Sequence, residues 1–118
     1  MESILTSIKK LLGIAEEYTH FDADLIMHIN SVFATLTQIG VGPSEGFYID
    51  DSSAVWSSFT DDVTSLASVK SYMHLKVRLL FDPPTSSAVM SSMERQISEF
   101  EWRLRVAAET LADNADEY

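Results

Sequence analysis

Apolar residues recur at helical spacing through four stretches of this chain, and all four glycines and all three prolines fall between those stretches. A period of 3.6 residues is typical of amphipathic helices, whereas Gly and Pro commonly end them. Strand-type alternation and internal repeats are not evident. A chain of 118 residues has the length of one domain. The pattern therefore predicts a small all-α bundle of about four helices, with residues 1–112 as a single domain and 113–118 as an acidic tail that frays on its own.

The expected helices cover roughly residues 4–12, 22–39, 62–81 and 86–112. Gly13 stands where the first helix needs a C-terminal cap, and Asp22 is expected to cap the start of the second. Gly40 and Gly42, followed by Pro43, are expected to end the second helix. Asp61 or Asp62 can cap the third, which Pro83-Pro84 ends. The third helix has the widest apolar arc, so we expect it to lie at the centre of the bundle.

Residues 40–60 form the least helical stretch, and they hold three of the four glycines. A loop of this length in a small domain is usually functional or disordered, and its aromatic side chains argue for order. It has room for a short helical turn or a small hairpin near residues 47–49. The loop is long enough to reach a neighbouring molecule, and its aromatics are expected to make contacts there: Phe47, Tyr48, Trp56 and Phe59.

Composition excludes several classes of function. The chain has 46% apolar residues, no cysteine and a formal net charge of −10. Disulfides, thiolate catalysis and Cys-based metal sites are therefore excluded, and wrapping of nucleic acid by phosphate neutralisation is disfavoured. No apolar run approaches the roughly 18 residues that span a bilayer, and the first residues lack the apolar segment of a signal peptide, so neither a membrane location nor export is expected.

Charge is divided unevenly along the chain. Residues 1–62 contain ten acids and two bases, residues 63–112 contain five acids and six bases, and the last six residues add three acids. Such a division lets the front half of one copy attract the third and fourth helices of another copy. Pairing within one molecule explains the same numbers, so both interpretations stand.

No motif in the sequence predicts catalysis, a cofactor or a metal. Residues 42–46 match the G-x-S-x-G pattern, but that nucleophile turn requires a preceding strand within a large sheet, and here a helix precedes it. The acidic pairs at 50–51 and 61–62 lack the spacing of a cation-binding loop. His20, His28 and His74 are not spaced as zinc ligands.

Two features of the third helix carry charge. Lys70, His74 and Arg78 follow one another at intervals of four and so form one basic stripe, either a solvated face or a contact for an acidic neighbour. Lys76 falls within the apolar arc. It either extends its ammonium group to the edge of that arc or pairs with a carboxylate in a buried contact.

Trp102 and Val106 lie on the fourth helix opposite its core stripe, four residues apart. A large aromatic residue exposed beside an apolar neighbour is a candidate interface anchor, unless the first helix or the long loop covers it. Around it, Arg95 and Arg103 belong to i, i+4 pairs with acidic residues, which add little stability each.

The sequence resembles the head–tail connector (portal adaptor) proteins of long-tailed bacteriophages and prophages over about residues 3–105. The resemblance rests on segments 29–33 and 40–43, on Trp56 to Phe59, on 69–72 and on 99–104. Its most specific element is the Lys-Val-Arg-Leu-Leu-Phe-Asp-Pro-Pro run at residues 76–84.

This resemblance implies a structural virion protein at the neck of the particle, made in the host cytoplasm. Such proteins assemble as a ring of roughly a dozen copies, docked beneath the portal protein. The ring is a platform for the stopper and tail-completion proteins, and DNA passes through its lumen without sequence-specific binding. No reaction and no cofactor are expected. The alternatives are another neck component, such as a stopper or tail-completion protein, or a non-enzymatic helical binding module acting as a monomer or dimer.

The surface residues expected to serve that assembly form two groups. The subunit interface is predicted at Lys70, His74, Lys76, Arg78, Arg95, Trp102, Arg103 and Val106. The C-terminal tail is predicted to dock on the portal or a neighbouring copy through Leu111, Asp113 and Tyr118, because an acidic end that frays alone gains order by docking.

Overall fold

A computed structural model describes residues 2–116, with side chains described as far as residue 112. Five α-helices follow one another along the chain: α1 (Ile4–Leu11), α2 (Asp22–Gln38), α3 (Trp56–Phe59), α4 (Val63–Phe81) and α5 (Ser87–Asp116). Four are substantial, and α3 is a single turn inside the long loop. The expectation of a small all-α bundle is confirmed.

Glycines end the first two helices as the sequence predicts. Gly13 has a φ of +80°, and the Ile14 N–H reaches back 2.8 Å to the Lys9 carbonyl. Gly40 has a φ of +90° and closes α2 in the same way. Both ends are Schellman motifs, in which a left-handed residue lets the last carbonyls of the helix find donors.

Caps at the helix starts match the sequence only in part. Asp62 caps α4, accepting hydrogen bonds from the Thr64 and Ser65 backbone N–H groups. Asp22 does not cap α2, because Phe21 occupies that position and Asp22 is the first helical residue. The Asp22 carboxylate instead lies 2.8 Å from the ammonium group of Lys9 on α1 and pairs with it.

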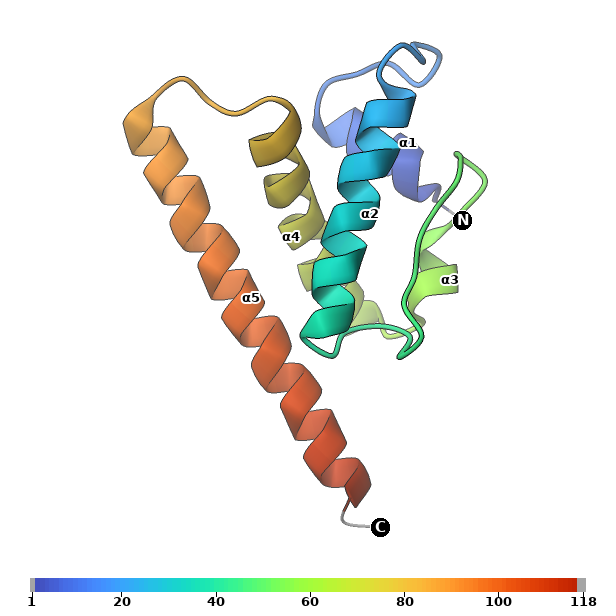
Figure 1. The fold of residues 1–118 in the computed structure, drawn as a ribbon, viewed down its shortest axis with the longest axis vertical. Helices are drawn as coiled ribbons and strands as arrows, with labels where there is room; N and C mark the ends of the chain where they lie inside the picture. The colour runs from blue at the N-terminus through green and yellow to red at the C-terminus, as the bar shows by residue number, and fades with distance from the viewer. Residues whose placement is uncertain (1, 117–118) are drawn as a thin grey trace.

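Helix α4 lies at the centre of the bundle, packed against α1, α2 and α5, as its wide apolar arc predicts. Figure 1 shows α2 and α4 side by side, with α5 slanting along the outer edge. The core joins buried residues of all five helices, among them Ile8, Phe33, Trp56, Tyr72 and Ile97. Burial of these apolar surfaces is the main stabilising contribution to a fold of this size.

The loop between α2 and α4 is ordered, and Asn30 of α2 holds its middle. The Asn30 side-chain amide donates to the Ile49 carbonyl at 2.9 Å and accepts from the Ile49 N–H at 2.8 Å. Farther along, Ser3 and Val55 form an isolated antiparallel bridge. The loop thus runs back along the bundle to the N-terminal segment (Figure 1).

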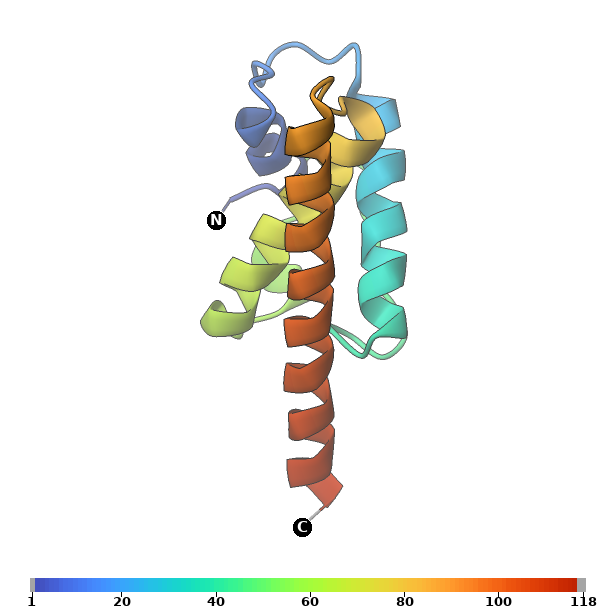
Figure 2. The same ribbon diagram turned by 90° about the vertical axis from the view of Figure 1, so that its left-hand side faces the viewer.

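Helix α5 is longer than expected, because it continues past residue 112 to Asp116. Figure 2 shows its C-terminal end extending beyond the rest of the molecule. Among the described side chains of α5, the last buried one is Leu104, and Leu111 is 62% exposed. Residues 105–112 therefore pack only in part against their own domain.

Candidate interaction surface

The outer face of α5 carries an exposed tryptophan. Trp102 is 62% exposed and Val106, one turn later, is 39% exposed. The opposite face of the same helix is buried against the bundle through Met93, Ile97 and Leu104, each at 5% exposure or less. Neither α1 nor the long loop covers the indole. The exposed apolar surface at Trp102 and Val106 is the one predicted from the sequence. Its role as a subunit interface stays a prediction.

A hydrogen bond fixes the rotation of α5 about its axis. The hydroxyl of Tyr72 on α4 donates to Glu101 on α5 at 2.7 Å. Burial, together with the Glu101 carboxylate, raises the pKa of Tyr72 well above that of a free tyrosine. Because Glu101 points toward α4, its neighbour Trp102 points away from the bundle.

The charged residues around Trp102 are largely free of ion pairs within the described part of the chain. Arg103 pairs with Glu99 on the same exposed surface. Arg95 and Glu99, like Arg105 and Glu101, have the i, i+4 spacing but form no ion pair among the described side chains, and Glu101 is engaged by Tyr72 instead. Arg95 and Arg105 are exposed, which leaves their guanidinium groups available to a partner.

The basic stripe of α4 is not a uniform solvated face. Lys70 lies 3.4 Å from the Glu2 carboxylate and 5.6 Å from the centre of the Trp56 ring. His74 is half-buried, and burial followed by the nearby Arg78 charge lowers its pKa. Arg78 is exposed. Only this last member of the stripe is fully open to solvent.

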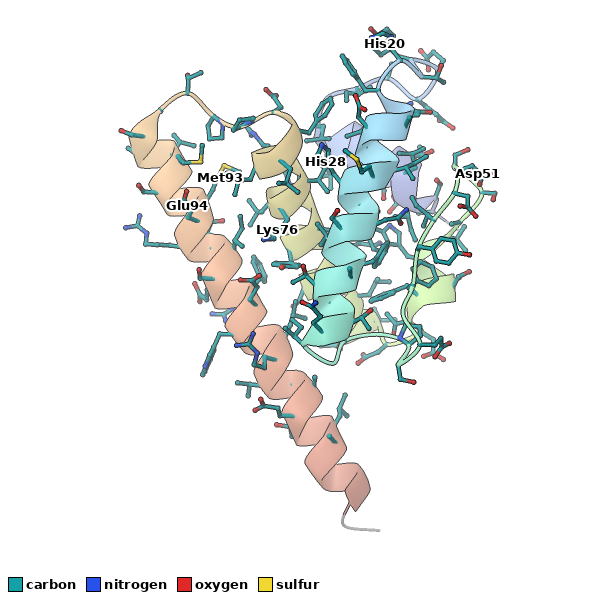
Figure 3. The ribbon with its side chains drawn as sticks, in the orientation of Figure 1. His20, His28, Asp51, Lys76, Met93 and Glu94 are labelled. Atoms are coloured by element: carbon teal, nitrogen blue, oxygen red, sulfur yellow. The ribbon has the colours of Figure 1, made fainter. Side chains whose placement is uncertain are left out.

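Lys76 leaves α4 on the side that faces α5 (Figure 3). It is partly exposed, and it forms no ion pair with the side chains that the structure describes. Of the two alternatives for this residue, the structure favours an ammonium group that extends to the edge of the apolar arc.

The loop aromatics require a correction. Trp56 and Phe59 are 3% and 4% exposed, and Phe47 is half-buried with its ring centroid 5.4 Å from that of Phe59. The Trp56 indole N–H also donates to the Ser7 hydroxyl at 2.9 Å. These three side chains complete the protein's own core around Phe33, so they are not available to a neighbour. Tyr48, at 70% exposure, is the one loop aromatic still able to make such a contact.

Two of the residues predicted for the C-terminal tail fall at the limit of the description. Asp113 belongs to α5, but its side chain is not described, and Tyr118 lies outside the described residues. Leu111 is described and exposed. A docking role for this end stays a prediction.

The residues of the motifs rejected on sequence grounds do not form a common site among the described groups. Ser44 lies in an exposed turn, and its hydroxyl approaches only the neighbouring Glu45 among the described groups. His20, His28 and Asp51 belong to separate parts of the molecule (Figure 3). The described residues contain no group of three or more His, Asp or Glu side chains that could hold a metal.

The structure also shows a buried lysine that the sequence did not single out. Lys9 is 2% exposed, and its ammonium group contacts Asp22 at 2.8 Å and the carbonyls of Glu16 and Tyr18 at 2.9 and 2.7 Å. This pairing ties the end of α1 to the start of α2. The two residues are 13 positions apart on different helices, so no local spacing marked them.

A small helical domain that has an exposed aromatic face and, among its described residues, no convergent catalytic group is typical of a structural subunit that acts by contact. A family model described as phage connector protein matches residues 4–110. The chain therefore belongs to the phage connector protein family, and its role is that of a phage head–tail connector, a structural component of the neck.

The match covers nearly the whole of the described domain, including α5 as far as its exposed end. No curated protein and no solved structure matches the chain significantly. Among the described residues, none of the helices has the length and apolarity needed to cross a membrane.

Proposed function

We propose that this protein is the adaptor ring of the neck: like copies close into a ring of roughly a dozen subunits, as cyclic assemblies do through two different faces per subunit. The ring docks beneath the portal protein, and stopper and tail-completion proteins assemble on its far side. Copies made in the host cytoplasm join the virion at this step. The protein acts by position and catalyses no reaction.

The observation that carries this proposal is the exposed face of α5 around Trp102. Tryptophan is enriched among the residues that dominate binding energy at interfaces. Its exposure cannot be relieved by turning α5, because the opposite stripe is buried and Tyr72 holds Glu101. A second copy placed against this face removes the indole from water.

The opposite flank of the molecule supports a head-to-tail arrangement. Figure 1 shows α5 along one edge and the long loop along the other. The loop edge carries exposed acids at Glu45, Asp50 and Asp51. Among its described side chains, helix α5 carries three exposed arginines among three exposed acids, so it offers that edge cations that the loop lacks. Two different flanks with complementary groups are what a closed ring requires.

The acidic character of the chain suits a channel for DNA. Proteins that bind DNA through its backbone place Lys and Arg against the phosphates, and every such contact slows passage. With a net charge of −10, this protein has few cations to offer to a moving duplex. A ring of such subunits lets DNA pass without holding it.

The test is assembly on purified portal protein, followed by native mass measurement and negative-stain imaging. We expect rings with the unaltered chain, and at least about a tenfold lower yield with Trp102→Ala, the loss typical of an interface anchor. Met27→Ala is the matched control, since Met27 is 58% exposed but lies on α2. Melting temperatures should be equal for all three proteins.

Two results would overturn the proposal. One is the absence of rings from mixtures of the unaltered chain and portal protein. The other is a drop in the melting temperature of the Trp102→Ala monomer that accounts for the whole loss of assembly. A monomer in the absence of portal protein is compatible with assembly on a template.

A further inference from the structure

A groove of about 490 Å³ lies between α1 and α4 and is lined by two lysines, Lys10 and Lys70, together with His74 and the acidic Glu2. Only eight lysines and arginines occur in the chain, so two of them in one groove is a local concentration. The buried side chains of Ile8 and Trp56 also line the groove, and Leu11, at 52% exposure, lies at its rim. The exposed part of the lining thus combines two lysines with one large apolar side chain, Leu11.

The polar groups of this groove are poorly satisfied by the described part of the chain. Nε2 of His74 is enclosed and has no hydrogen-bond partner there. Lys70 has the exposed Glu2 at 3.4 Å, a type of pair that contributes little. Lys10 is exposed. A carboxylate entering the groove gains two ammonium groups at once.

The end of α5 has the complementary composition. After Arg105 the chain carries four acids, Glu109, Asp113, Asp116 and Glu117, and no base. Apolar Leu111 stands among them and is 62% exposed. Figures 1 and 2 both show α5, described as far as Asp116, extending beyond the rest of the molecule on the side away from α1. The backbone of α5 therefore runs away from the groove of its own copy.

We infer that residues 109–118 of one copy dock in the α1–α4 groove of a neighbouring copy. The inference rests on the proposed ring and names a second contact in it, separate from the Trp102 face. From Leu104 to Asp116 the helix rises about 18 Å, at about 1.5 Å per residue, which is enough to cross to an adjacent subunit. Carboxylates of this segment, the C-terminal arm, meet Lys10 and Lys70, while Leu111 meets Leu11.

The chain contains no cysteine, so single cysteines can report this contact. Ser71→Cys places a thiol on the groove lining, and Asn114→Cys places one in the arm. We expect a mixture of the two variants, oxidised in the portal-bound assembly, to give a disulfide between different chains. Ser52→Cys, in the long loop outside the groove, is the matched control and should not link to Asn114→Cys.

Charge reversal tests the chemistry of the contact. When Lys10→Glu is added to the Ser71→Cys variant, the yield of disulfide-linked chains should fall about fivefold, as expected for an exposed charge contact. Adding Asp113→Lys and Asp116→Lys to the Asn114→Cys variant should restore that yield. Ala23→Glu with Ala34→Glu changes the net charge equally on the exposed side of α2 and should leave the yield unchanged.

Ring mass, measured on the same samples, separates the two proposals. Rings without the 71–114 link refute the docking of the arm and leave the connector ring standing, whereas absence of rings from the unaltered chain refutes both. A link between Asn114→Cys and the portal protein, or within one chain carrying both cysteines, also overturns the inference. The inference is also overturned if Lys10→Glu and the control with Ala23→Glu and Ala34→Glu give equal yields of linked chains.

Discussion

The hydroxyl of Tyr72 on α4 donates a hydrogen bond to Glu101 on α5 across 2.7 Å. Tyr72 is fully buried, and Glu101 directly precedes the exposed Trp102. A contact inside the domain therefore determines what α5 presents outside it. The relationship links the stability of the monomer to the orientation of the proposed interface.

Replacement of Tyr72 by Phe removes this hydrogen bond and keeps the ring in the core. Glu101 is partly exposed and can be solvated, so the expected loss is that of an ordinary hydrogen bond, about 1 kcal/mol in the free energy of unfolding. Urea denaturation measures it. Tyr48→Phe is the control, because Tyr48 is 70% exposed. Equal stability of the two variants would contradict the role given to Tyr72.

Alkaline pH should destabilise the protein through the same residue. The pKa of Tyr72 is raised above 10.0, the value for a free tyrosine, because burial and the Glu101 carboxylate disfavour the phenolate. Above that pH the unfolded chain releases a proton that the folded chain retains, so stability falls as pH rises. Unfolding measured across this range should show a shallower decline for Tyr72→Phe. Parallel curves would show that Tyr72 does not couple to folding.

Gly42 should tolerate alanine less well than Gly13. Both have a positive φ, +86° and +80°, so each substitution carries a similar backbone cost of roughly 1–2 kcal/mol. A methyl group at Gly42 also collides with the Phe59 ring, whereas nothing lies within 4 Å of one at Gly13. We expect Gly42→Ala to be less stable than Gly13→Ala by about 1–3 kcal/mol in thermal or urea unfolding. Equal stability of the two variants would show that the Phe59 ring can move aside, so that the predicted steric clash at residue 42 does not occur.

Lys9→Met should also be strongly destabilising. It leaves the Asp22 carboxylate and the carbonyls of Glu16 and Tyr18 without their shared donor. Breaking a buried pair costs about 3–5 kcal/mol, and because the Asp22 side chain is 27% exposed we expect a loss near the low end of that range. Hydrogen exchange over residues 14–21 should rise together with the loss of stability. Lys10→Met, at an exposed neighbouring position, is the control and should change neither quantity.

Local sequence signals predicted most of the secondary structure. Gly13, Gly40 and Asp62 act at the helix ends where they were expected, because caps depend on residues within a few positions. The apolar arc of α4 predicted its central position, since a helix contacted on several sides needs apolar residues on several sides. The exposure of Trp102 followed from the same periodicity on α5.

The sequence by itself determined the helices, their apolar faces, the negative net charge and the resemblance to phage head–tail connectors. Only the tertiary structure decided that Trp56 and Phe59 fill the core, that Lys9 pairs with Asp22, and that Asn30 holds Ile49. Each of these contacts joins segments that are distant in the sequence, so the periodicity of apolar residues could not predict them. The α1–α4 groove depends on the same folding, which brings Lys10 beside Lys70 and His74.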